Sequence, residues 1–166
     1  MSLQDDLKNQ APKGAIMSPD GLYRYRLWRF WDLNPKTVTF IMLNPSTANS
    51  HQDDPTVRKC IAYAKSWGFT GLYIVNLFAL RATDPQRLLV HPDPVGPFNL
   101  DHIQMGREFS EVTIAAWGNS KIIKRLKPRL PSTKGLSYLE LAKDGTPKHP
   151  LYLYGNLKPK SWTQKI

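Results

Sequence analysis

The chain has 166 residues, of which 41% are hydrophobic and 22% charged, and this size and composition predict a single soluble domain. It contains no transmembrane run or signal-peptide pattern, and its single cysteine, Cys60, excludes a disulfide framework and a cysteine zinc cluster. We therefore expect a cytoplasmic protein without a membrane partner. Lysine and arginine total 23 against 13 acidic residues, and the net charge of +10 favours a partner that carries phosphate groups, most commonly nucleic acid.

The first part of the chain is predicted to be a flexible arm followed by two strands. Residues 1–20 are polar, contain two prolines and lack periodicity, so we expect a flexible N-terminal arm and a single α/β domain over residues 21–166. Residues 23–32 alternate bulky side chains with arginine, which predicts a strand with one basic face. Residues 37–43 form a continuous apolar run. The intervening Asn34-Pro35 turn predicts a hairpin or an adjacent antiparallel pair.

The next segment has the pattern of a helix between two parallel strands. Asp53 or Asp54 can cap a helix over residues 53–68, with Pro55 suited to its first position and Gly68 to its end. Residues 71–80 are again apolar. A strand, a helix and a strand in this order predict a βαβ unit with parallel pairing.

The second half of the chain continues the alternation of helices and strands. Residues 82–97, rich in proline and aspartate, predict a long ordered loop or lid. Residues 98–110 predict a helix, 111–119 a third apolar strand, 120–130 a basic amphipathic helix and 136–142 a fourth parallel strand, before a closing loop and short helix. The expected fold is a three-layer α/β sandwich with a short, mainly parallel sheet.

Polar residues cluster where the predicted strands end. Because the carboxyl ends of parallel strands meet at one edge of a sheet, this edge is where α/β proteins bind ligands. The candidates are Asn44, Ser46, Asn76, Arg81, Asn119 and His149. These amides and one imidazole suit a planar base better than a metal ion, so we expect neither a metal nor a cofactor.

Some of these residues also have ordinary structural explanations. Asn44 precedes a proline and is typical of a turn, and His149 can be a structural histidine in a loop. Asn76 lies inside an apolar run, where an unsatisfied amide costs about 1–3 kcal/mol, which favours a functional role. The carboxylates of "HQDD" at residues 51–54 are better explained by a helix cap than by a metal site.

Five motifs in this order resemble a bacterial and phage family catalogued as domain of unknown function 1643. They read "LNPSTA", "DDPTVRKC", "NLFALRATDP", "AAWGN" and "GTPKHPLYL", and the resemblance extends from about Tyr23 to Leu157. The family name implies no activity.

The order of the motifs is also similar to that of the uracil-DNA glycosylase superfamily. "MLNPS" resembles the first superfamily motif, which implies that Asn44 positions a water molecule. "GLYIVN" resembles the strand whose asparagine reads the base, here Asn76, and "KHP" resembles the last motif, whose histidine, here His149, stabilises the departing base. The sequence departs from the superfamily in lacking the glycine of the first motif and the Ser-Pro of the last.

The resemblance implies a uracil-DNA-glycosylase-like fold that binds a nucleobase, a nucleotide or nucleic acid (DNA or RNA) at the carboxyl edge of the sheet. Asn44 and His149 would be catalytic in N-glycosidic hydrolysis. Asn76, Ser46, Arg81 and Asn119 would bind the substrate, and Lys148, Lys158 and Lys160 would contact the phosphate backbone. Two alternatives stay open: a non-catalytic nucleic-acid binding module, and an enzyme that uses the same cleft for a nucleotide-like small metabolite.

Overall fold

The computed structural model describes residues 11–162, which form an α/β fold around one mixed sheet. The strands are β1 (Lys13–Met17), β2 (Arg24–Phe30), β3 (Thr37–Met42), β4 (Gly71–Asn76), β5 (Val112–Ala115), β6 (Ser137–Tyr138) and β7 (Lys160–Ser161). The α-helices are α2 (Pro55–Ser66), α3 (Asn99–Phe109) and α4 (Ser120–Leu126), and two short 3₁₀ helices are η1 (Pro85–Leu89) and η2 (Pro150–Tyr152).

The sheet is less parallel than the sequence predicts. Its strand order is β1-β2-β4-β3-β5-β6-β7. The pairs β4-β3, β3-β5 and β5-β6 are parallel, whereas β1-β2, β2-β4 and β6-β7 are antiparallel. The predicted βαβ unit and the fourth parallel strand are therefore present, but the described sheet is mixed. The fourth parallel strand is only two residues long.

The predicted pairing of β2 with β3 is wrong because the start of β4 lies between them. The backbone N–H of Thr70 donates to Lys36 O at 2.8 Å, and Thr70 O accepts from Trp31 N at 2.9 Å. The turn between β2 and β3 therefore spans a third strand instead of closing a hairpin. As a result, β4 pairs parallel with β3 on one side and antiparallel with β2 on the other.

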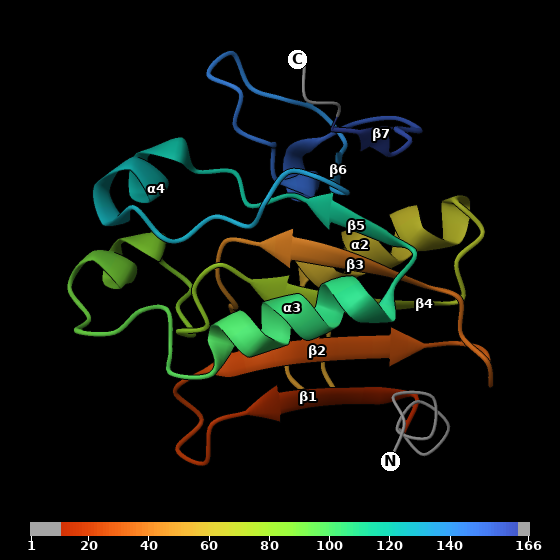
Figure 1. The fold of residues 1–166 in the computed structure, drawn as a ribbon. Helices are drawn as coiled ribbons and strands as arrows, with labels where there is room; N and C mark the ends of the chain where they lie inside the picture. The colour runs from red at the N-terminus through yellow and green to blue at the C-terminus, as the bar shows by residue number, and fades with distance from the viewer. Residues whose placement is uncertain (1–10, 163–166) are drawn as a thin grey trace.

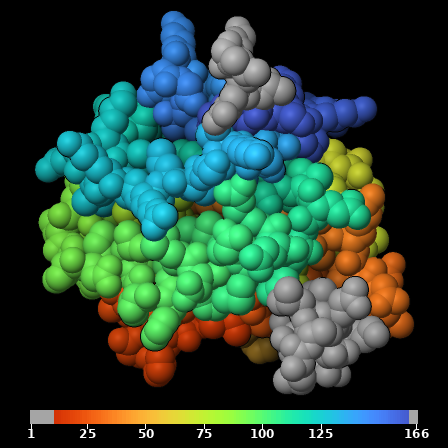
Figure 2. All heavy atoms as spheres, in the orientation of Figure 1, coloured from red at the N-terminus to blue at the C-terminus, as the bar shows by residue number. Residues whose placement is uncertain are grey.

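Apolar side chains fill the space between the sheet and its helices on both faces. In Figure 1, α3 lies in front of the central strands and α2 lies behind them. Val57, Cys60 and Ala64 of α2 pack against one face of the sheet, and Ile103 of α3 belongs to the core on the other face. The space-filling view shows α3 and the chain around α4, in green and cyan, closing over the face that carries α3 (Figure 2). The arrangement has three layers, as predicted.

Part of the predicted N-terminal arm is a strand. Residues 13–17 form β1, which pairs antiparallel with β2 and extends the edge of the sheet. Gly14 permits this pairing because a Cβ there would lie 2.0 Å from the ring of Trp28. The short polar segment has no periodicity because its pairing partner, and not an apolar face, fixes its conformation. Residues 1–10 of the predicted arm lie outside the described part of the chain.

The arginines of β2 do not form one basic face. Ile16 pairs with Arg26 but Met17 pairs with Arg24, so Tyr25 is an extra residue in β2 and its neighbours turn to opposite faces. Arg24 reaches the loop after β3 through Ala48, whereas Arg26 contacts α3. All three arginines of the strand are buried. The prediction that this strand has one basic face is therefore wrong.

Candidate functional site

A cavity of about 1060 Å³ opens at the carboxyl ends of β3 and β4, beside the residues that follow β5. This is the edge of the sheet at which the sequence predicts a site. It lies on the face of the sheet that carries α2, and the starts of α2, α4 and η2 also contribute to its lining. Of the predicted site residues, six line it: Asn44, Ser46, Asn76, Asn119, Lys148 and His149. Arg81, Lys158 and Lys160 are not part of the lining.

Asn76, the last residue of β4, presents an unpaired amide to the cavity. The residue is 0% exposed, yet neither Nδ2 nor Oδ1 has a hydrogen-bond partner among the described residues. Its position is fixed through the backbone, because Asn99 Nδ2 donates to Asn76 O at 2.7 Å and to Leu77 O at 3.1 Å. Both N–H donors of Nδ2 and the acceptor Oδ1 are thus available for a ligand. An unpaired buried amide costs about 1–3 kcal/mol.

Asn44, just after β3, is oriented by its own amide nitrogen. Nδ2 donates to Pro45 O at 3.0 Å and to Ala82 O at 2.8 Å. These two bonds leave Oδ1 as an acceptor, so the side chain can hold a water molecule or an N–H group. An amide cannot take up a proton as a general base. Ser46 lies two residues further along the same loop and is partly buried in the lining.

His149 enters the cavity as a neutral hydrogen-bond donor. Its Nδ1 accepts from Leu151 N at 3.2 Å at the start of η2, which places the proton of the neutral ring on Nε2. Burial lowers the pKa of His149 to about 4, and the nearby carboxylate of Asp54 only partly offsets this effect. Gly118 lies against it with a φ of +59°, and a Cβ there would lie 3.1 Å from His149 Cβ. A glycine is therefore required for this close contact.

Two charged residues of the cavity were missed by the sequence interpretation. Arg24 of β2 is only 3% exposed, and its Nε has no partner among the described residues. Asp54 caps α2 as predicted, accepting from Val57 N at 2.8 Å, and it also lines the cavity. The position of Arg24 in the cavity was not predicted, because its alternation with bulky residues is also typical of an exposed basic strand. Asp54 was predicted only as a helix cap, and its place in the cavity lining was not expected.

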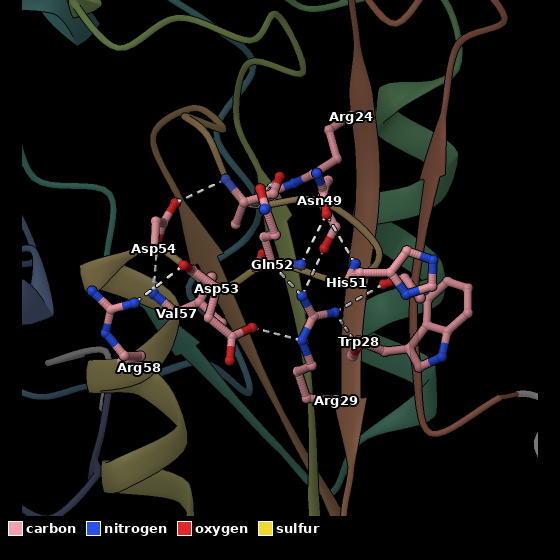
Figure 3. A network of polar contacts seen from close by, with 12 residues as sticks. Arg24, Trp28, Arg29, Asn49, His51, Gln52, Asp53, Asp54, Val57 and Arg58 are labelled. Atoms are coloured by element: carbon pink, nitrogen blue, oxygen red, sulfur yellow. Dashed lines mark hydrogen bonds and ion pairs between the residues drawn. The ribbon is translucent and has the colours of Figure 1, made fainter.

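The loop between β3 and α2 is held against the sheet by the buried Arg29. Its Nε donates to Asp53 Oδ1 at 2.8 Å, and Nη2 donates to Asn49 O at 2.6 Å. Nη1 donates to Trp28 O, next to it in β2. Figure 3 shows these bonds joining β2 to the loop, and Arg58 of α2 donating to Asp53 O in the same network. Because the same loop carries Ser46 and ends at Asp54, the network fixes one wall of the cavity.

The remaining predicted residues have other partners or other positions. Asn119 Oδ1 caps α4 by accepting from Ile122 N at 3.4 Å. Lys148 Nζ forms a 2.6 Å ion pair with Glu140, and this lysine holds the pKa of that carboxyl below its ordinary value. Arg81 Nη1 donates to Gly21 O at 3.3 Å. Lys158 and Lys160 are exposed near the C-terminal end of the described chain.

An exposed aromatic side chain stands at the rim of the cavity. Tyr152 is 76% exposed, lines the cavity and has its ring centroid 6.3 Å from that of His149. Tyr154, two residues further on, is 89% exposed. Tyr152 was not predicted as a site residue, because "HPLYLY" is an apolar run whose exposed members cannot be distinguished by composition.

Within residues 11–162 no helix is long and apolar enough to cross a membrane. Over the same range, no group of three or more His, Cys, Asp or Glu residues comes together in an arrangement able to hold a metal ion. Cys60, on the buried face of α2, has a pKa raised by burial and belongs to the core.

The fold and its cavity at the end of the parallel strands define an α/β protein with a cavity at the sheet edge. The model of a family described as "Protein of unknown function (DUF1643)" matches residues 24–151. The chain belongs to this family, and the matched region contains all the strands that end at the cavity. Neither the curated proteins nor the solved structures provide a significant match.

Proposed function

We propose that this cavity binds a nucleobase and that the protein hydrolyses an N-glycosidic bond, with a fold like that of the uracil-DNA glycosylases. The observation that carries the proposal is the unpaired amide of Asn76, which is fully buried and lines the cavity. Such an amide offers a donor beside an acceptor, and the edge of a base offers the complementary pair. A flipped base would satisfy both atoms at once.

The roles of the other residues follow from their free atoms. Asn44 Oδ1 would hold the attacking water, and His149 Nε2–H would donate to a base oxygen as negative charge develops there. In the reaction the bond between the base nitrogen and the sugar carbon breaks, and its electron pair leaves with the base. The water oxygen bonds to the sugar carbon and loses a proton, and the base takes one up. No acidic group is needed, because the neutral histidine stabilises the departing anion.

Basic residues and exposed tyrosines near the cavity support nucleic acid as the partner. Lys121 and Lys148 line the cavity, and residues 121–134 contain six lysines and arginines and no acidic residue. Cations bind phosphates, and exposed aromatic rings such as Tyr152 stack on bases. The expected binding is therefore sensitive to salt. A non-catalytic binding module would use the same surface. The alternative is favoured because residue 44 is an asparagine and not a carboxylate that could act as a general base.

The test is the release of a base from oligonucleotides. Single- and double-stranded oligonucleotides carrying uracil, hypoxanthine or a G·T mismatch are incubated with the protein and assayed for abasic sites. We expect abasic product from the unchanged protein and at least a tenfold loss in His149→Ala and Asn44→Ala, consistent with the effect of one preorganised donor. His51→Ala is the control, because this exposed imidazole does not line the cavity. Salt-sensitive binding without any abasic product would support the binding module instead.

A further inference from the structure

We propose that the base bound in this cavity is a 6-oxopurine, read jointly by Arg24 and Asn76. The inference rests on the proposed function and adds the class of base. The observation behind it is the buried guanidinium of Arg24, on the neighbouring strand β2, which lines the same cavity and has unused hydrogen-bond donors.

Arg24 holds a positive charge inside the cavity wall with few protein partners. The guanidinium can donate five hydrogen bonds, and within the described residues it donates one, from Nη1 to Ala48 O at 3.1 Å. Nε is buried without a partner. Burial lowers the pKa of Arg24 to about 10, which the carboxylate of Asp54 partly opposes, so the group stays charged at neutral pH. A buried cation with unused donors favours a ligand that brings acceptors.

Arg24 and Asn76 face the cavity from the same side of the sheet. Arg24 contacts the loop that leads into α2, and Asn76 continues the row of Leu72 and Ile74, which belong to the core beneath α2. Their strands are neighbours in the sheet, and beyond the last ladder pair, Leu27 with Ile74, Arg24 N donates to Ala79 O, three residues after Asn76. Because both residues line the same cavity, we infer that one planar ring can contact both side chains.

A 6-oxopurine is the base class that matches this set of donors and acceptors. Asn76 would accept the N1–H proton at Oδ1 and donate from Nδ2 to O6. The guanidinium of Arg24 would donate to N7 and O6, the paired acceptors that arginine recognises on guanine. Uracil offers the same edge to Asn76 but has a C–H group where the purine has N7. Adenine turns an amino donor towards the arginine. Uracil would offer the arginine only its carbonyl oxygen and adenine only N7, so either base provides one acceptor in place of two.

The test changes single atoms of the ligand while the protein stays the same. Dissociation constants are measured by titration calorimetry for free hypoxanthine, 7-deazahypoxanthine, uracil and adenine. We expect hypoxanthine to bind about tenfold or more tightly than each of the other three, which is the discrimination that one bidentate arginine contact provides. In Arg24→Gln, the advantage of hypoxanthine over its 7-deaza analogue should fall below about twofold, as expected when that contact is removed.

The outcomes separate this inference from the proposed function. Uracil binding as tightly as hypoxanthine, or an unchanged affinity for the 7-deaza analogue, overturns the purine assignment and leaves nucleobase binding intact. Failure of every base to bind overturns both. If Arg24→Gln does not fold, the four ligands and the unchanged protein still decide the question, because the loss of N7 alone removes the proposed contact.

Discussion

Replacing Asn76 with leucine should stabilise the protein while it removes ligand binding. The side chain is 0% exposed and neither amide atom has a partner among the described residues, so the folded state carries the cost of an unsatisfied amide. That cost is about 1–3 kcal/mol, and leucine, of similar length, removes it. We therefore expect the free energy of unfolding of Asn76→Leu to equal that of the unchanged protein or to exceed it by about 1–3 kcal/mol.

Urea denaturation measures this effect, and equal slopes against denaturant show that the two proteins expose the same surface on unfolding. Asn99→Leu is the matched control, because Asn99 is equally buried but donates two hydrogen bonds, to Asn76 O and Leu77 O. Its replacement removes these two buried hydrogen bonds and should lower the free energy of unfolding by about 2 kcal/mol or more. A loss above about 1 kcal/mol in Asn76→Leu would refute the reasoning, since it would show that the amide serves the fold.

Three further predictions concern the surroundings of the site. Arg29→Ala should lower the free energy of unfolding by about 3–5 kcal/mol in urea denaturation, because it leaves Asp53 and several carbonyls without their buried partner; a loss below about 1 kcal/mol would contradict this. Gly118→Ala should cost about 1–2 kcal/mol and weaken base binding, because its φ is +59° and the added Cβ meets His149; unchanged stability and affinity would refute the contact. Burial lowers the pKa of His149 and of His102 to about 4, so between pH 6.5 and 4 the unfolded chain binds protons that the folded chain does not. The free energy of unfolding should therefore decrease as the pH is lowered from 6.5 to 4, by up to about 3 kcal/mol per histidine. Denaturation at a series of pH values measures this decrease, and it should be smaller in His149→Gln.

Local signals in the sequence were sufficient to predict the elements that form one side of the site. Asp54 and Pro55 mark the start of α2, and the structure has that cap and that proline. The order of strand and helix gave the parallel pairing of β3 with β4, which brings Asn44 and Asn76 to one edge. These features depend on contacts near in sequence, on the handedness of crossovers and on the direction of parallel strands.

The features that sequence patterns did not predict depend on contacts far apart in the chain. The insertion of β4 between β2 and β3 cannot be predicted from the Asn34-Pro35 turn, because a turn does not determine which strands pair with each other. The extra residue Tyr25 turns Arg24 and Arg26 to opposite faces, which an alternating pattern cannot show. A loop buries Arg29 and α3 buries Arg26, so the predicted single basic face does not form.

The most direct test of the account follows the side-chain amide of Asn76 by NMR. Its Nδ2 resonances are identified by their absence from the spectrum of Asn76→Leu, and hypoxanthine and uracil are then titrated in turn into the labelled protein. The account predicts that a bound base shifts these resonances to saturation, whereas the Nδ2 resonances of Asn99, which already donate to two carbonyls, move far less. Asn76 resonances that do not move with either base would show that this cavity does not bind a nucleobase through Asn76.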